Sequence, residues 1–261
     1  MDKLLMRKLI TRRALLAIAL WLAFLAPAVA QFGHPIGQTS YPATSGGGGT
    51  IALVHSAGSQ GSGSATSQPQ TITATTAGNG VVVGVGYCYN NGCSAGGTDE
   101  VSGVTVGSQN CAEVAGTFQQ GGGGGFLFAT EIWVCPGVSS GDTTVTATMS
   151  TAEFYIAVAA SEWSGMAASS PADGSTANIA NNGTTSTLSI STNGNTSVSG
   201  DLIYSFGASQ VGTLTPSATI INSITASAND QYQIAGAPGS YTNAWTGGTG
   251  SNGGSLAAFK P

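Results

Sequence analysis

The fold is decided first by the stretch Glu153-Phe-Tyr-Ile-Ala-Val-Ala-Ala160, in which a large apolar residue recurs at every second position. Successive side chains of a β-strand point to opposite faces of the sheet. Phe154, Ile156 and Val158 therefore share one face, whereas Tyr155 and small alanines occupy the other. The small residues allow another layer of the protein to approach this second face closely.

The stretch Asp201-Leu-Ile-Tyr-Ser-Phe-Gly-Ala208 alternates in the same way. Leu202, Tyr204 and Phe206 lie on one face of the expected strand, and Ile203 lies on the other. Both stretches predict a sheet with one strongly apolar side, which is buried when it packs on a second layer.

The rest of the composition favours strands and turns. The 261 residues include 40 Gly and much Ser and Thr, whereas the good helix formers Lys, Arg, Glu and Leu are scarce. We expect strands at residues 51–55, 71–75, 81–88, 101–106, 112–115, 126–135, 143–149, 153–163, 185–191, 201–208, 219–227, 232–235 and 255–259. About a dozen strands without helical segments predict an all-β fold, a two-sheet antiparallel sandwich in one domain over residues 50–261.

The N-terminus has the three parts of a secretory signal. Five of the six basic residues lie in the first thirteen positions, and an apolar run at 14–25 and the small-residue motif Ala28-Val-Ala30 follow. We expect a signal peptide at residues 1–30 and a flexible Gly/Pro-rich leader at 31–49. The apolar run is shorter than the roughly 18–20 residues of a retained anchor, and Arg12-Arg13 leaves twin-arginine export open as an alternative.

After cleavage the chain would keep Lys260 as its one basic residue and ten carboxylates, a formal charge of −9. Nucleic acid and anionic lipid are bound mainly by Lys and Arg. The charge therefore predicts that nucleic acid is not a partner. The cleavable signal predicts a secreted or cell-surface protein, or a periplasmic one, without a membrane span in its mature form.

Four cysteines in an oxidising compartment predict two disulfides, and four cysteines allow three pairings. Cys88 and Cys93 surround a turn sequence, which favours a local bridge. Cys111 and Cys135 flank an expected hairpin in which residue 113 lies opposite residue 133, so a cross-strand bridge fits. The spacing does not favour zinc.

Several short motifs occur in a familiar order: Ile51-Ala-Leu-Val54, Ala77-Gly-Asn-Gly80, Gly141-Asp-Thr-Thr144, Ser161-Glu-Trp-Ser-Gly165, Ser170-Pro-Ala-Asp173, Gly200-Asp-Leu-Ile203 and Ala257-Ala-Phe-Lys260. Together they resemble a secreted bacterial β-sandwich module of uncharacterised function, over nearly all of residues 50–261. The resemblance implies a jelly-roll-like sandwich without catalytic activity. The Cys88–Cys93 loop and the glycines at 121–125 depart from the plainer form of that pattern.

Catalytic motifs are scarce, and we predict that the protein is not an enzyme. The only histidines are His34 and His55, which leaves few candidates for the general base of a hydrolytic triad. A glycoside-active enzyme is a further alternative, because Glu113 and Glu131 are expected as diagonal neighbours on one hairpin. Solvated surface charges are the simpler interpretation of this pair.

Glu162 ends an apolar strand, so its burial would require hydrogen-bond donors, for example the backbone N–H groups of a neighbouring turn. No metal ligands are predicted, and no cofactor is expected. A structural calcium ion is the one metal that the composition favours. Its candidate ligands lie in or beside loops: Asp99, Glu100, Asp142, Asp173, Asp201 and Asp230.

Two functions remain. The first is a structural or interaction module of the cell envelope or extracellular matrix, with other extracellular proteins as partners. The second is a carbohydrate-binding module for neutral glycans, in which Trp133, Trp163 and Trp245 would supply stacking faces. Exposed, coplanar rings would distinguish the second function from the first.

Overall fold

The computed structural model describes residues 50–89, 93, 98–123, 126–174, 178–179, 183–209, 214–225 and 228–261. All of them belong to one compact unit, Thr39–Pro261. Within these ranges the protein is all-β and every strand pairing is antiparallel, which confirms the predicted class. Nothing in the described ranges is a helix of the length and apolarity that crossing a membrane requires. The predicted signal peptide and leader lie outside the described residues.

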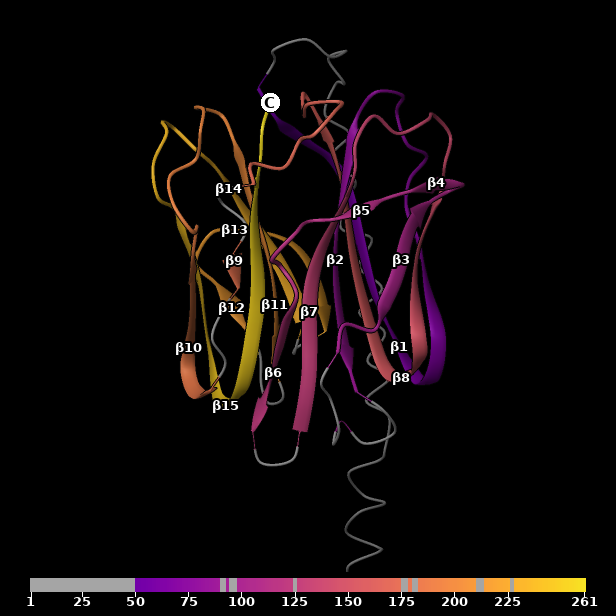
Figure 1. Cartoon of the computed structure of the whole chain (residues 1–261), viewed down its shortest axis with the longest axis vertical. Coiled ribbons are helices and arrows are strands. Elements are labelled where there is room, and N and C mark those ends of the chain that lie inside the picture. Colours follow the sequence, from indigo (N-terminus) through magenta and orange to yellow (C-terminus); the bar gives the residue numbers. More distant parts are fainter. Residues whose placement is uncertain are drawn as a thin grey trace, which may run out of the picture. The chain divides into compact units, whose positions relative to one another are not determined.

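The first sheet contains eight strands and is organised around the longest of them, β8 (Figure 1). Along one edge β8 pairs with β1 over almost its whole length; along the other it pairs first with β3 and then with β2. This branching makes the sheet nearly barrel-like. Its strands are β1 (Ala52–Thr71), β2 (Gly80–Cys88), β3 (Val101–Val106), β4 (Gln109–Asn110), β5 (Ala112–Glu113), β6 (Gln119–Gly123), β7 (Phe126–Cys135) and β8 (Thr144–Ser164).

The second sheet contains seven strands, and its main path runs β10-β15-β11-β14-β13. The long strand β15 also pairs with the short strands β9 and β12. The strands are β9 (Asn178–Ile179), β10 (Gly183–Ser191), β11 (Leu202–Ser209), β12 (Thr215–Pro216), β13 (Thr219–Thr225), β14 (Ala228–Ile234) and β15 (Thr242–Phe259).

A hydrophobic core lies where the two sheets face each other. The predicted face of β11 supplies Tyr204 and Phe206, both fully buried, and β8 supplies alanines that permit the close approach expected from the sequence. Gly84 and Gly86 of β2 lie beneath Phe206. A Cβ atom at either glycine would come within 2.6 or 2.7 Å of the Phe206 ring. The two sheets therefore pack closely because β2 carries no side chain at these positions.

A second core lies on the opposite face of the first sheet, which points away from the second sheet and is enclosed by the first sheet's own curvature. We call this the inner face of the first sheet. Val81, Val83 and Val85 of β2 point into it, together with apolar side chains of β3, β7 and β8. Alternation along β2 thus sends Val81, Val83 and Val85 to this core, and sends Val82 and the two glycines to the core between the sheets. The acidic residues described below lie on this inner face.

Both predicted disulfides are present. Cys88 and Cys93 have Cα atoms 4.9 Å apart, and Cys111 and Cys135 have Cα atoms 4.3 Å apart. The predicted register of β5 and β7 is also confirmed, because Glu113 lies opposite Trp133.

Several strand predictions were wrong in their bounds. No strand was expected at residues 56–70, which belong to β1, whereas residues 72–75 of the predicted strand 71–75 form a loop. The strand expected at 255–259 is the end of β15, which begins at Thr242. Two expected strands, 143–149 and 153–163, are one continuous strand, β8. The β1 sequence is rich in Gly and Ser, so its strand conformation comes from pairing with β8 rather than from local propensity.

Candidate functional site

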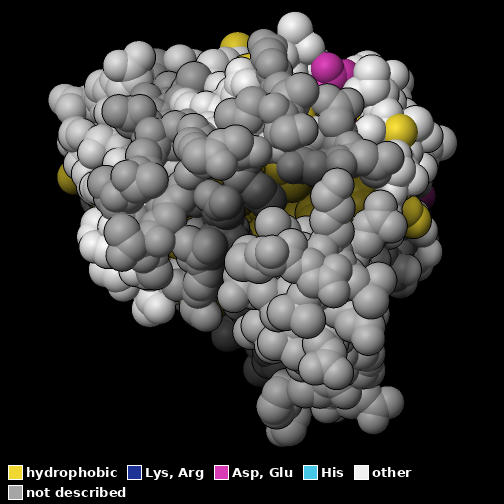
Figure 2. Space-filling view, turned by 90° about the horizontal axis from the view of Figure 1, so that it is seen from below, with side chains coloured by type: hydrophobic (Ala, Val, Ile, Leu, Met, Phe, Trp, Pro, Cys, Tyr) yellow, Lys and Arg dark blue, Asp and Glu magenta, His cyan; other side chains and the backbone are white. Residues whose placement is uncertain are grey.

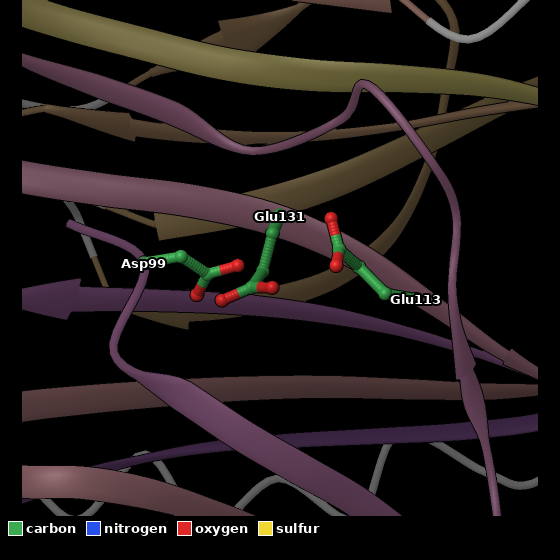
Figure 3. Close-up of side chains that lie close together, drawn as sticks. All are labelled: Asp99, Glu113 and Glu131. Atoms are coloured by element: carbon green, nitrogen blue, oxygen red, sulfur yellow. The ribbon is translucent and has the colours of Figure 1, made fainter.

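Three carboxyl groups from separate segments meet on the inner face of the first sheet (Figure 3). They belong to Asp99, which precedes β3, to Glu113 of β5 and to Glu131 of β7. One carboxylate oxygen of each residue lies within 4.8 Å of the corresponding oxygens of the other two. We call these three residues the acidic trio. Asp99 and Glu113 are exposed, whereas Glu131 is buried.

Glu131 is held in the core by its strand. It lies opposite Val85 of β2, and its side chain is 0% exposed. The indole Nε1 of Trp133 donates a hydrogen bond to Oε2 over 2.9 Å, but Oε1 accepts none from the residues that the structure describes. Desolvation, followed by the negative charge of Asp99, raises the pKa of Glu131 to about 9.

Glu113 is brought beside Glu131 by the pairing of β5 with β7 and by the adjacent Cys111–Cys135 disulfide. The strand ends at Glu113, although the backbone N–H of Val114 still donates to the carbonyl of Ile132 (2.9 Å). Beyond it the Thr117 hydroxyl donates to the carbonyl of Val114 (2.7 Å) and accepts from the backbone N–H of Ile132 (3.0 Å), so a side chain replaces the backbone partner where the pairing stops. Desolvation and then the charge of Asp99 raise the pKa of Glu113.

Asp99 is positioned by a loop that two tyrosines of the inner face hold in place. Tyr89 donates its hydroxyl hydrogen to the carbonyl of Thr98 (2.7 Å), and the Tyr87 hydroxyl accepts from the backbone N–H of Glu100 (2.9 Å). The N–H of Val101 donates to Oδ1 of Asp99 (3.0 Å). Partial burial nevertheless raises the pKa of Asp99. Sequence reasoning missed this role of Tyr87 and Tyr89, because alternation predicts only that Tyr87 is buried.

No basic side chain is available to the acidic trio within the described ranges. Lys260 is the only Lys or Arg beyond position 13, and it lies near Asp201 of the second sheet. The one described histidine, His55, has its Nε2 2.5 Å from Glu162 Oε2. Charge in the trio can therefore be compensated by protons or by an external cation.

Glu162 is a second buried glutamate of the first sheet, and unlike Glu131 it has several partners within the fold. It is 1% exposed and accepts hydrogen bonds from Asn79 Nδ2 (2.5 Å) and from the backbone N–H of Thr76 (2.9 Å), in addition to its contact with His55. Burial acts to raise the pKa of Glu162, but these partners outweigh it and lower the pKa. The expectation that donors from a neighbouring turn satisfy this glutamate is confirmed. Because His55 is paired here, its role is structural.

The other predicted calcium ligands do not join the trio. Glu100 accepts hydrogen bonds from Thr98, Ser150 and Thr151. Asp230 is fully buried in the second sheet, where it accepts from Tyr204 and Asn222. Asp173 accepts from the backbone N–H of Ser197 and lies near Asp201. Asp142 lies beside Gly107 in another loop.

The three tryptophans expected as stacking faces are core residues, which corrects that interpretation. Trp163 and Trp245 are 0% exposed, and Trp133 is 8% exposed. Each indole N–H has an internal acceptor: Ser161 for Trp163, Asn229 for Trp245 and Glu131 for Trp133. Burying a large ring with its polar atom satisfied stabilises the fold, but it leaves no ring face for a glycan.

Comparison with known protein families, with curated proteins and with solved structures gives no match. The resemblance to a secreted jelly-roll-like module therefore stays a prediction, and the site is interpreted from its own geometry.

Proposed function

We propose that this protein is an exported, non-catalytic module that serves a structural or interaction role in the cell envelope or extracellular matrix, and that its fold is a jelly-roll-like two-sheet sandwich. The observation that carries the proposal is the inward placement of its reactive and aromatic groups. His55 is paired with Glu162, Glu131 is fully buried, and the three tryptophans among the described residues lie in the cores.

The sandwich description is supported by the core that β2, β7 and β8 share with β11, β14 and β15. The curvature of the first sheet is the feature that departs from a plain sandwich. Figure 2 shows one face of the molecule, on which the described side chains are mostly uncharged. Such a surface favours partners that are held by shape and backbone contacts rather than by charge.

Fractionation with N-terminal sequencing tests the export step. The protein should be recovered from the periplasm, the envelope or the medium with an N-terminus at or near Gln31, and a full-length chain embedded in the inner membrane would overturn the proposal.

A glycan array and hydrolysis assays on the same material test the functional class. We expect no turnover and no saturable binding to neutral glycans, and retention with envelope or matrix material after a salt wash. Saturable binding to a neutral glycan would identify the carbohydrate-binding alternative. Turnover lost in Glu113→Gln or Glu131→Gln would identify a glycoside-active enzyme.

A further inference from the structure

One carboxylate oxygen of the acidic trio is buried without a hydrogen-bond donor among the described residues. Oε1 of Glu131 is buried, accepts no hydrogen bond from the described residues, and belongs to a side chain that lies between those of Asp99 and Glu113 (Figure 3). Buried polar atoms in folded proteins nearly always have a partner, so an orphaned carboxylate oxygen indicates a proton, an ion or water at that point.

The surroundings exclude a partner from the chain's own basic residues. Lys260 lies near Asp201, and His55 contacts Glu162. Three carboxyl groups this close repel one another when ionised. Two arrangements remain: Asp99 and Glu131 share a proton, or a cation binds all three groups.

The geometry fits one class of cation. Ca²⁺ binds oxygen atoms at about 2.3–2.6 Å, so two of its ligands can lie at most about 5 Å apart, and the trio's oxygens lie within 4.8 Å of one another. An all-oxygen donor set favours Ca²⁺, Mg²⁺ or Mn²⁺ over zinc. Mg²⁺ requires shorter bonds in a regular octahedron, whereas Ca²⁺ accepts irregular sites completed by water. The exposed Asp99 and Glu113 leave room for such waters.

We propose that Asp99, Glu113 and Glu131 form a Ca²⁺-binding site in which the buried Glu131 is the base and the two exposed acids form the rim. This site goes beyond the proposed function and does not depend on it. It links β7 to β5 and to the loop before β3, so the bound ion joins three segments of the first sheet. Affinity of the extracellular class, with a Kd of about 10⁻⁴–10⁻³ M, is expected.

Terbium luminescence and calorimetry test the site on the disulfide-bonded chain as recovered from the producing cells. Tb³⁺ has the same oxygen preference as Ca²⁺, and Trp133, which is hydrogen-bonded to Glu131, is a sensitiser beside the site. We expect saturable Tb³⁺ luminescence on tryptophan excitation, its displacement by Ca²⁺, and a calorimetric Ca²⁺ isotherm with one site. Mg²⁺ should compete at least about tenfold more weakly.

Four variants distinguish Ca²⁺ binding at the acidic trio from attraction to the overall negative charge of the protein. Asp99→Asn, Glu113→Gln and Glu131→Gln should each weaken Ca²⁺ binding by about tenfold or more, because each removes one charged ligand. Asp142→Asn removes the same charge outside the trio and should change the Kd less than about twofold. Asp99 and Glu113 are exposed, so their variants test the site even if a change at Glu131 affects folding.

Three results would overturn the assignment. The first is the absence of saturable Ca²⁺ binding up to about ten times the expected Kd, which would leave a shared proton as the partner of Glu131. The second is binding that all three trio variants retain. The third is equal affinity for Mg²⁺, which would exclude Ca²⁺ as the selected ion.

Discussion

Glu131 and Glu162 lie at similar buried positions on either side of β2, but their hydrogen-bond donors and charged neighbours differ. Both are fully buried, and both lie opposite β2, where Glu131 pairs with Val85 on one side and Glu162 with Val81 on the other. Their side chains therefore point to the same inner face of the first sheet. Glu162 has three partners and a lowered pKa, whereas Glu131 has one donor, two acidic neighbours and a raised pKa.

The contrast shows that burial alone does not decide the role of a carboxylate. Around Glu162 the fold supplies two hydrogen-bond donors to Oε1 and places the His55 ring beside Oε2, which is typical of a structural residue. Around Glu131 it supplies one donor and brings two further acids close, so the compensation must come from outside the chain. This difference is the basis for assigning a structural role to Glu162 and for proposing a binding role for Glu131.

The largest expected effect is the loss of Glu162. Glu162→Ala leaves His55, Asn79 and the N–H of Thr76 without their acceptor, so the free energy of unfolding at pH 7 should fall by about 3–5 kcal/mol. The pKa of Glu162 is lowered in the folded state, so its contribution is present above the unfolded pKa of 4.5 and is lost as the pH falls through the folded pKa.

Urea titrations at pH 7 and below pH 4.5 measure this effect, and the gap between wild type and variant should narrow in acid. Glu100→Ala, which removes a glutamate bonded only to surface hydroxyls, is the control and should cost less than about 1 kcal/mol. Equal losses in the two variants would contradict a structural role for Glu162.

The second effect concerns how the Glu131 region is held together. Cys111–Cys135 closes a loop with a sequence separation of 24, against 5 for Cys88–Cys93. Replacing the first pair by alanine should lower the free energy of unfolding by about 2–4 kcal/mol, roughly 1 kcal/mol more than replacing the second pair. Denaturation of the two double variants measures the difference. A larger loss from the local pair would show that β5 does not depend on its cross-strand bridge.

Local pattern was enough to predict several parts of both regions. Alternation placed Phe206 in a core, turn sequence and hairpin register gave both disulfides, and the position of Glu162 after an apolar strand predicted its backbone donors. The register that sets Glu113 opposite Trp133 was also predicted. The disulfides and the register depend on residues that are near in sequence or on one hairpin. For Glu162 the sequence predicted only that donors were needed, since the backbone donor is the distant Thr76.

What the sequence could not supply is the association of distant segments. Asp99 was considered for calcium and Glu131 for acid chemistry, but nothing local joins them, because the loop of Asp99 is placed by hydrogen bonds to Tyr87 and Tyr89. Residues 56–70 of β1 were missed for the same reason, since pairing with β8 imposes their conformation. The tryptophans could not be placed from type alone, because rings with a polar atom are equally suited to cores and surfaces.

Asp201 extends the comparison to the second sheet. Desolvation first, and then the charge of Asp173, raise its pKa from 3.8 to about 6. A raised folded pKa means that the protein loses stability as the pH rises from about 4 to about 6. Asp201→Asn should therefore raise the free energy of unfolding by about 1–2 kcal/mol at pH 7 and by little at pH 3.5. Thermal unfolding of wild type and variant between pH 3.5 and pH 7 measures this difference in stability, and Asp142→Asn is the control. An equal gain in stability at all pH values would contradict a raised pKa of Asp201.

The smallest effect is the sharpest test, because one substitution is made at both glutamates. Glu131→Gln keeps an oxygen for the Trp133 indole, adds an amide that can donate to Asp99 and stays neutral without taking up a proton on folding. Without divalent cations, stability at pH 7 should therefore rise by about 1–2 kcal/mol. Glu162→Gln turns an amide donor toward a set of donors and should lower stability. Differential scanning calorimetry in EDTA shows whether each of the two substitutions raises or lowers the stability of the protein. Ca²⁺ at about 10 mM should stabilise wild type but not Glu131→Gln. Destabilisation by both substitutions in EDTA would mean that Glu131 is as fully satisfied by the fold as Glu162.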